Sequence, residues 1–528
     1  MLFNSYEFIF LFLPIAFLGY FLVARKGREL AIAWLVLASL FFYGWWNPAY
    51  LLLIIASMLV NFGIGKALSK THGSTGGRSK LLLTLGIVLN LGVLGYYKYA
   101  GFFIENLNAI AGIDYHLKTI VLPLAISFFT FQQIAYLVDA YRGITKEYRF
   151  SHYALFVTFF PQLIAGPIVH HNEMLPQFAR REALRASLSN ICIGLSIFAI
   201  GLFKKAVLAD GIANYGTTVF DSAANGSELA FFGAWGGALA YTMQLYFDFS
   251  GYSDMAIGGA RIFGIRLPLN FHSPYKATNI VEFWRRWHMT LSRFLRDYLY
   301  IPLGGNRKGK IRRYINLITT MLLGGLWHGA GWTFVIWGAL HGSYLIINHA
   351  WIHAREALGL PRHAEPSRMD KSLSWLLTFL AVVVGWVFFR ANDLDSAMAI
   401  LRGMSGMNGV ALPNAILLRL GEIGDWLASI GIHPRLGGGS EFTLTYLWVI
   451  SLLTIALFAP NTQQIMANFE PALTPYPSNG RYQINPIDKL ESLASWRPSA
   501  RWAVITGVIA ALGVLALSSV SEFLYFQF

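Results

Sequence analysis

Charged residues are scarce in this sequence of 528 residues: Asp, Glu, Lys and Arg make up 13% of the chain, whereas hydrophobic types make up 55%. A soluble domain carries about 25% charged residues, so this composition is typical of a membrane protein. The net charge is nevertheless +14 at pH 7. Apolar runs of this density exclude a nucleic-acid-binding protein, which would need a basic groove on a soluble fold. The excess positive charge must therefore reflect membrane topology.

Cysteine is almost absent, since Cys192 is the single one in the chain. One thiol excludes an internal disulfide framework and a thiolate metal cluster, and we expect Cys192 to be a small buried packing residue. The sequence also lacks a Walker-type loop, a dinucleotide fingerprint, an HExxH helix and an EF-hand loop, so we expect neither nucleotide hydrolysis nor a metal site. The first apolar run, Phe8 to Val23, has no basic n-region and no cleavage site, and predicts a retained span.

Apolar windows long enough to cross a bilayer, about 20 residues each, recur along the whole sequence. We expect an all-α polytopic membrane protein with roughly 11 to 12 transmembrane helices and re-entrant segments. The windows leave no room for a soluble domain, so residues 1–528 are predicted to form one membrane domain. The predicted spans are 8–23, 30–46, 49–64, 81–97, 119–138, 188–203, 229–247, 315–327, 333–347, 373–389, 442–458 and 503–517.

Short loops rich in Lys and Arg stay on the cytoplasmic side, and they set the orientation. The basic loops 25–28, 66–80 and 142–149 fall on one side, so the N-terminus is expected outside. Residues 154–169 have basic loops at both ends, which predicts a re-entrant hairpin broken at Pro161, Gly166 and Pro167 and lining a cavity. Lys204 and Lys205 would then lie outside, against the rule.

Most of the excess charge is local. Residues 261–313 hold twelve basic side chains and two acidic ones, or ten of the fourteen excess positive charges. One interpretation is plain topogenesis with contact to anionic lipids. The other is a site for an anionic cytosolic donor, such as a phosphorylated thioester carrier.

Within this basic segment, residues 282–300 read EFWRRWHMTLSRFLRDYLY. The helical period gathers aromatic and aliphatic side chains on one face and arginines on the other. We therefore predict one amphipathic helix, lying at the membrane surface or in the inner rim of the protein. His288 falls on its aromatic face, where a histidine is either a packing residue or a functional group.

A second histidine, His328, lies between two tryptophans and several glycines in the stretch GGLWHGAGWTFVIWGALHG, residues 324–342. An ionisable group at that depth is costly and indicates function by default. Burial favours the uncharged imidazole, which can accept a proton from a hydroxyl group. His341 does not share a helical face with His328 and is expected to be structural.

A pair of carboxylates, Asp248 and Asp254, lies near the inner end of the span in the stretch 241–264. Their spacing of six residues is not a helical i, i+3 or i, i+4 contact. They could orient a basic partner or a histidine, or they could simply pair with nearby arginines.

Five stretches closely resemble the membrane-bound O-acyltransferase family, in particular its bacterial branch that modifies polysaccharides such as alginate and teichoic acid. They are PLAISFFTFQQIAYLVDAYRG (123–143), FFPQLIAGPIVHHNEMLPQ (159–177), 246–254, 270–305 and 325–342, and the resemblance is densest over a core of about 120–345. The combination of WRRWH at 284–288 with WHG at 327–329 is the most specific part. The opening and closing segments resemble alginate-type members.

The resemblance implies that His328 is the essential membrane-embedded histidine and that His288 is the second catalytic position. It also implies a funnel or tunnel that joins the two membrane faces at His328. As further candidates for contacts with the substrate or the donor we take Arg285, Arg286, Trp327, Asp248 and Asp254. His328 would act as a general base on a hydroxyl or as an acyl-carrying nucleophile, and the sequence does not choose between these.

In such proteins an acetyl group passes from a cytosolic thioester donor, acetyl-CoA or another acyl thioester, to an acceptor across the membrane. The resemblance therefore implies a multi-pass protein of the bacterial inner membrane with no bound cofactor. It also implies a polysaccharide acceptor and a periplasmic acetyltransferase partner. The alternatives are a family member that acylates a lipid or a protein and a polytopic transporter, although transporters often show an internal repeat that we do not find here.

Overall fold

The computed structural model describes residues 1–70, 77–118, 120–145, 149–359, 367–473, 494–518 and 524. The described chain is almost entirely helical, with one small sheet. The first third contains η1 (Glu7–Phe12), α1 (Leu13–Ala24), α2 (Arg28–Gly44), α3 (Ala49–Lys70), α4 (Gly77–Leu94), η2 (Gly95–Tyr99), α5 (Ala100–Ala111), α6 (Ile126–Tyr141), α7 (Phe150–Thr158), α8 (Phe160–Leu163) and α9 (His171–Phe178).

The middle of the chain carries the longest helices. It contains η3 (Arg181–Leu184), α10 (Leu188–Phe203), η4 (Lys204–Ala209), α11 (Asp210–Ala224), α12 (Phe231–Ile262), η5 (Pro274–Lys276), α13 (Ile280–Arg286), α14 (Met289–Leu295), η6 (Arg296–Tyr300), α15 (Gly309–His328) and α16 (Trp332–Ala357). Four short elements of the first two thirds of the chain, η1, η2, η4 and η6, are π-helical turns.

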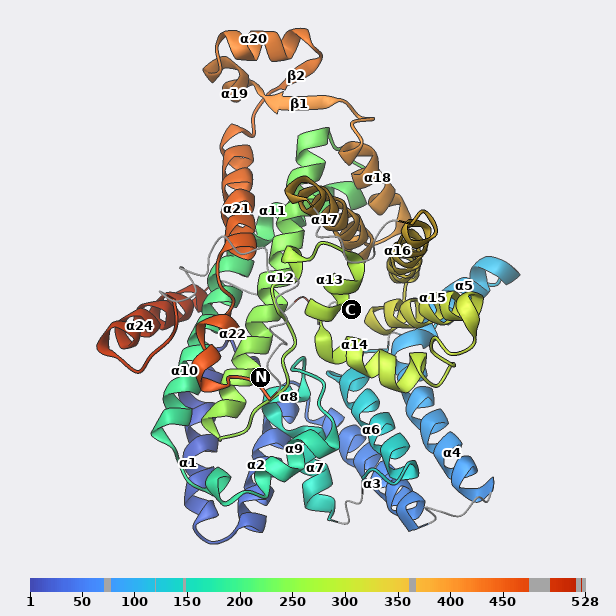
Figure 1. Ribbon diagram of the computed structural model, residues 1–528, viewed down its shortest axis with the longest axis vertical. Helices are drawn as coiled ribbons and strands as arrows, with labels where there is room; N and C mark the ends of the chain where they lie inside the picture. Colours follow the sequence, from blue (N-terminus) through green and yellow to red (C-terminus); the bar gives the residue numbers. More distant parts are fainter. Residues whose placement is uncertain are drawn as a thin grey trace.

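The last third contains α17 (Arg368–Arg390), α18 (Leu394–Met404), β1 (Val410–Pro413), α19 (Asn414–Arg419), α20 (Glu422–Ser429), β2 (Ile432–Arg435), α21 (Gly439–Phe458), α22 (Thr462–Ile465), η7 (Ala467–Phe469), α24 (Ala500–Leu515) and η8 (Ala516–Ser518). β1 and β2 pair in parallel. This two-stranded sheet, with α19 and α20, projects beyond the end of α21 (Figure 1).

Helix α12 runs through the middle of the molecule and organises the rest around it (Figure 1). It packs along α10, α11, α17, α18 and α21, and nearly all of its side chains beyond the first turn are buried. Helices α1 to α4 and α6 form one half, while α15 and α16 form a hairpin beside α13 and α14. Residues of α12 belong to both of the buried hydrophobic clusters of the described chain.

The prediction of an all-α polytopic membrane protein is confirmed. Seven helical segments of the described chain are long and apolar enough to cross a membrane: 7–24, 49–70, 77–111, 188–224, 368–390, 439–458 and 500–518. Each of the other predicted spans also contains a helix, namely α2, α6, α12, α15 and α16. Thr119, where one predicted span begins, lies outside the described residues, and α6 starts only at Ile126.

The segment from 188 to 224 resolves the conflict over Lys204 and Lys205. The predicted span ends at Phe203, but the helix continues through the π-helical turn η4 into α11, giving 37 residues without a break. The two lysines therefore lie inside a helix and not in a loop. The positive-inside rule applies to loops, so it makes no statement about this pair.

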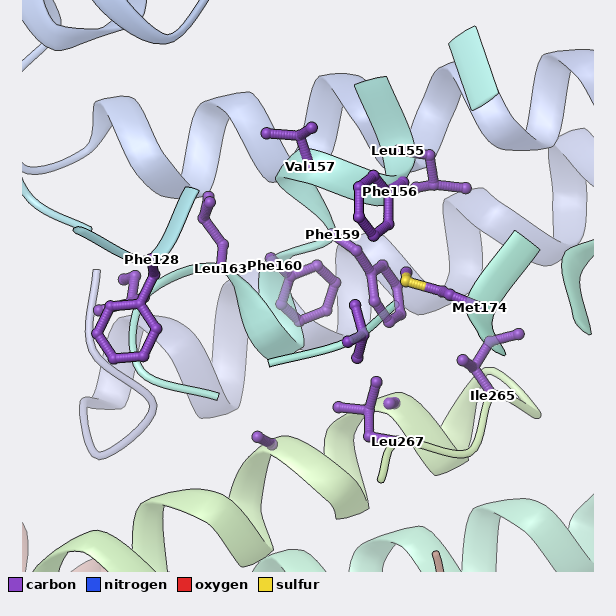
Figure 2. Close-up of a cluster of buried hydrophobic side chains, with 14 of the residues drawn as sticks. Phe128, Leu155, Phe156, Val157, Phe159, Phe160, Leu163, Met174, Ile265 and Leu267 are labelled. Carbon is purple, nitrogen blue, oxygen red and sulfur yellow. The ribbon is translucent and has the colours of Figure 1, made fainter. Parts of the chain in front are cut away.

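The re-entrant segment after residue 154 is strongly broken and completely buried. α7 stops at Thr158, α8 is a single turn, and residues 164–170 are irregular before α9 begins. Gly166 permits this path, since a Cβ atom there would collide with the backbone of Gln162. Figure 2 shows side chains of this segment, among them Phe159, Phe160 and Leu163, packed together with residues of neighbouring elements. Irregular backbone at membrane depth is tolerated because protein surrounds it.

Two sequence predictions are wrong. Residues 282–300 do not form one amphipathic helix, because the chain breaks at His288, between α13 and α14, and turns into a π-helix at η6. The helical period of the side chains persists across a break, which is why the pattern gave no warning of it. Cys192 is exposed on α10 and is not a buried packing residue.

Candidate active site

His328 is the last residue of α15, where the helix stops before the irregular residues 329–331. Its side chain is buried, with 5% exposure. Three aromatic rings stand edge-on to the imidazole at centroid distances of 5.0, 5.1 and 5.0 Å: Trp327, Trp337 and Phe389. An aromatic wall of this kind keeps the ring in one orientation and excludes water from its faces.

Small residues explain why α15 and α16 approach so closely around His328. A Cβ atom on Gly325 would collide with the carbonyl oxygen of Phe334, and one on Gly338 would collide with that of Met321. Glycines of this kind let two helices in a membrane pack backbone to backbone. The helical hairpin therefore holds His328 at its closed end.

His288 lies beside His328, and the two imidazole centroids are 6.4 Å apart. His288 is completely buried and has a φ of +41°, a left-handed conformation between α13 and α14. Such a backbone is unfavourable for a residue with a Cβ atom and costs about 1 to 3 kcal/mol. The surrounding contacts must therefore hold the chain in this shape, which turns the His288 side chain towards the site.

Asn270, a residue that the sequence did not single out, orients His288. Its Oδ1 accepts a hydrogen bond from His288 Nδ1 at 3.0 Å and one from the Thr290 hydroxyl at 2.9 Å. Its Nδ2 donates to Ser253 Oγ at 3.1 Å, so both ends of the amide are occupied. With the oxygen facing the imidazole, Nδ1 of His288 carries the proton and Nε2 is the basic nitrogen.

A cavity of about 110 Å³ opens beside His328. Its wall is formed by the chain just after α2, by the π-helical turn η2, by residues 122–128 at the start of α6 and by the broken segment after α7. This confirms that part of the predicted hairpin lines a cavity. The lining residues are Trp46, Lys98, Leu122, Pro123, Leu124, Ala125, Ile126, Ser127, Phe128, Ile164, Ala165, Trp327 and His328. A tunnel to the opposite face stays a prediction.

The other predicted aromatic and histidine positions have different surroundings. Trp327 lines the cavity and stacks on Phe131 with centroids 5.3 Å apart. His341 does not line it, and is buried among rings that include Trp337 and Trp284 at 4.8 and 5.3 Å. This packing agrees with the structural role expected for His341.

Asp248 and Asp254 lie on α12 and form ion pairs with the two lysines of η4. Lys205 Nζ is 2.6 Å from Asp248 and 2.7 Å from Asp210. Lys204 Nζ is 2.8 Å from Asp254, whose carboxylate also accepts the Thr462 hydroxyl at 2.6 Å. We call these residues the lysine–aspartate cluster. The structural partners of the two aspartates are therefore lysines and not the expected arginines. A substrate contact of the aspartates stays a prediction.

The two candidate arginines differ sharply. Arg286 is buried and forms an ion pair with Glu282 at 2.7 Å. It also donates to the carbonyl oxygen of His272 at 3.3 Å. Arg285 is exposed. The structure therefore keeps Arg285 available to a ligand, whereas Arg286 is engaged with its own chain.

Comparison with known proteins agrees with this architecture. Residues 119–384 match the family model of the membrane-bound O-acyltransferases. The chain is 48% identical to the peptidoglycan O-acetyltransferase of Helicobacter pylori over 439 residues, which covers 78% of this chain and 81% of that protein. It is 41% identical to the probable alginate O-acetylase AlgI of Pseudomonas putida over the full length of both.

A more distant relative is the teichoic acid D-alanyltransferase of Streptococcus thermophilus, 29% identical over 51% of this chain and 69% of that protein. The helical membrane fold and the family match together place the chain in a class of membrane-embedded transferases. The chain belongs to the membrane-bound O-acyltransferase family, and it is therefore an acyltransferase.

Proposed function

We propose that this protein is an O-acetyltransferase that moves acetyl groups from a cytosolic thioester to an envelope polysaccharide, with His328 and His288 as its catalytic residues. The observation that carries the proposal is the cavity that ends at the buried imidazole of His328, with His288 only 6.4 Å from it. The full-length similarity to a probable alginate O-acetylase and the high identity to a peptidoglycan O-acetyltransferase support acetyl as the transferred group.

The acceptor approaches through the cavity in this proposal. The cavity wall includes Trp46 and residues 122–128, which the charge distribution predicts on the outer side of the membrane. Basic residues 261–313 face the opposite, cytoplasmic side in the same prediction. The donor therefore comes from the inner side, and the exposed Arg285 is a candidate to contact it.

The chemistry follows from an uncharged, buried imidazole. The acceptor oxygen attacks the thioester carbonyl carbon, its proton passes to His328, and the carbon–sulfur bond breaks. The departing thiolate takes up the proton, which leaves an ester and a free thiol. In the two-step alternative, the His328 nitrogen attacks the thioester carbonyl carbon, the carbon–sulfur bond breaks, and the thiolate leaves with the imidazole proton. The acceptor hydroxyl then attacks the acetylated imidazole, the carbon–nitrogen bond breaks, and the hydroxyl proton returns to the imidazole. His288, oriented by Asn270, presents its basic Nε2 beside this reaction.

The proposal is tested by following labelled acetyl groups in inverted membrane vesicles that contain the full chain. Label supplied as acetyl-CoA, or as an acetylated carrier protein, should appear as hydroxylamine-sensitive ester on polysaccharide inside the vesicles. General base catalysis contributes about 100-fold to 10,000-fold, so His328→Ala should reduce transfer by that factor at normal membrane abundance.

His341→Phe is the matched control, because it also replaces a buried histidine but one outside the cavity wall. It should retain transfer in proportion to the amount of protein present. Near-normal transfer by His328→Ala would contradict the assignment of the catalytic residue. Label that appears on lipid or protein, with none on polysaccharide, would contradict the assignment of the acceptor.

A further inference from the structure

Two consecutive side chains of the π-helical turn η2 cap the end of the helix that carries His328. Lys98 Nζ donates to the carbonyl oxygens of Trp327 at 2.5 Å and of His328 at 3.0 Å. Tyr99 Oη donates to the carbonyl oxygen of Leu326 at 2.6 Å. Three successive carbonyls at the end of α15 are thereby bound from one neighbouring turn.

These carbonyls need such partners. The last four carbonyl groups of a helix have no partner within the helix, and they form the negative end of its dipole. A cationic side chain there both satisfies the oxygens and complements the charge. The residue directly after His328 is extended, so α15 cannot continue into another turn that would satisfy them.

Lys98 differs from the two lysines of η4, which also lie inside a helix. Lys204 and Lys205 lie within 2.8 Å of carboxylates, whereas the described chain has no carboxylate within 4.0 Å of Lys98 Nζ. Its partners are the backbone oxygens of the WHG stretch. Lys98 also lines the cavity that ends at His328, so its amino group borders the same space as the imidazole.

The turn that carries Lys98 and Tyr99 is itself unusual. A π-helical turn inserts an extra residue into a helix and is often found at functional sites. Here it interrupts the long segment 77–111 directly beside the end of α15. Lys98 and Tyr99 are the last two residues of this turn, and both side chains reach the same neighbouring helix end.

We propose that Lys98 is a positioning residue for the transfer reaction, and that it acts by holding the carbonyls of Trp327 and His328 so that the His328 imidazole stays at the end of the cavity. The inference rests on the proposed function of His328. A displacement of a catalytic group by about 1 Å can cost about 100-fold in rate, so loss of this clamp has a large effect on turnover.

The test compares variants of Lys98 in the labelled vesicle assay. Lys98→Met removes all donors and should reduce maximal turnover per molecule about 100-fold, with the donor concentration for half-maximal rate unchanged, because Lys98 lies away from the donor side. Lys98→Arg keeps the charge and the donors and should restore turnover to within about 10-fold of wild type. Tyr99→Phe removes one of the three bonds and should have the smaller effect.

Lys80→Met is the matched control, since Lys80 is an exposed lysine in the same long helical segment and should leave turnover unchanged. Turnover of Lys98→Met within about twofold of wild type, at equal membrane abundance, would overturn the inference. So would a loss that only follows a fall in abundance, or an equal loss in the Met and Arg variants. If the His328→Ala protein retains transfer activity, the proposed function fails. If the Lys98→Met protein has normal turnover while the His328→Ala protein is inactive, only the role of Lys98 is contradicted.

Discussion

Two polar regions lie on opposite faces of α12, and they are built in different ways. On one face, Phe249 and Ser253 point towards His288, through a ring contact of 4.8 Å and through Asn270. On the other, Asp248 and Asp254 bind the lysines of η4. The 3.6-residue period of the helix places these two pairs of side chains on opposite faces.

The difference between the two regions separates a reactive arrangement from a stabilising one. The lysine–aspartate cluster balances each buried positive charge with carboxylates at 2.6 to 2.8 Å. The histidine region contains buried imidazole and aromatic rings, a left-handed backbone at His288 and a cavity. Strained backbone and accessible space beside ionisable groups indicate function. Removing one partner of a closed, buried ion pair instead destabilises the fold. Substitutions in the lysine–aspartate cluster should therefore lower membrane abundance, whereas substitutions in the histidine region should lower turnover.

The largest expected effect on the amount of folded protein comes from Lys205→Met. This change leaves Asp248 and Asp210 without their buried partner, which typically costs about 3 to 5 kcal/mol of stability. Membrane abundance should fall steeply, as measured by immunoblotting and by thermal unfolding in detergent. Lys205→Met combined with Asp248→Asn should recover part of the loss. Normal abundance with reduced turnover would instead give the cluster a catalytic role and remove the contrast between the two faces.

The next effect concerns the orientation of His288. Asn270→Leu removes the acceptor of the Nδ1 proton, and a hydrogen bond of this kind contributes about 1.5 kcal/mol, so turnover should fall about 10-fold. His288→Ala should reduce turnover further but leave residual transfer. Both should keep near-normal abundance in the vesicle assay. A fall in abundance that matches the fall in activity would make His288 a structural residue.

A smaller effect separates the two neighbouring arginines. Lysine cannot reproduce the planar, paired contacts of a guanidinium group, so Arg286→Lys should weaken the bond to Glu282 and mainly lower stability. Arg285→Lys should insert normally and turn over more slowly, with the defect partly relieved by excess donor. The measurement is transfer across donor concentrations. An unchanged donor dependence for Arg285→Lys would assign this arginine to membrane topology alone.

The smallest effect is expected from topology probes, which should leave activity unchanged. Cysteine at Gly112 should react with an impermeant thiol reagent outside intact cells, and cysteine at Lys308 should not. Because Cys192 is exposed in the structure, the experiment needs a Cys192→Ser background. Labelling at Lys308 from outside would reverse the orientation and with it the direction of acetyl transfer.

Much of the fold could be predicted because the bilayer imposes its thickness on the sequence. Each predicted span contains a helix, and His328 is recognisable as an ionisable residue among glycines and tryptophans. The failures are local. Helical periodicity continues across the break at His288, so the pattern predicted one helix where there are two. The boundary after Phe203 was misplaced because Lys204 and Lys205 look like a loop when their carboxylate partners are unknown.

Asn270 and Lys98 were missed for a related reason. Asn270 is 18 residues from His288 along the chain and contacts it only because α12 and the loop after it return to α14. Lys98 is 230 residues from His328, and its one sequence signal is an ionisable residue directly after an apolar run. No periodicity links positions so far apart, since periodicity describes neighbours within one element.

The sequence by itself determined the membrane class, the helical spans and the exceptional position of His328, because hydropathy and the cost of burying charge act residue by residue. The tertiary structure decided which polar groups meet. It paired Lys204 and Lys205 with the aspartates of α12, turned His288 towards His328 and brought Lys98 to the end of α15. These contacts depend on helix packing and on the breaks between helices, which follow from the whole chain and not from any single segment.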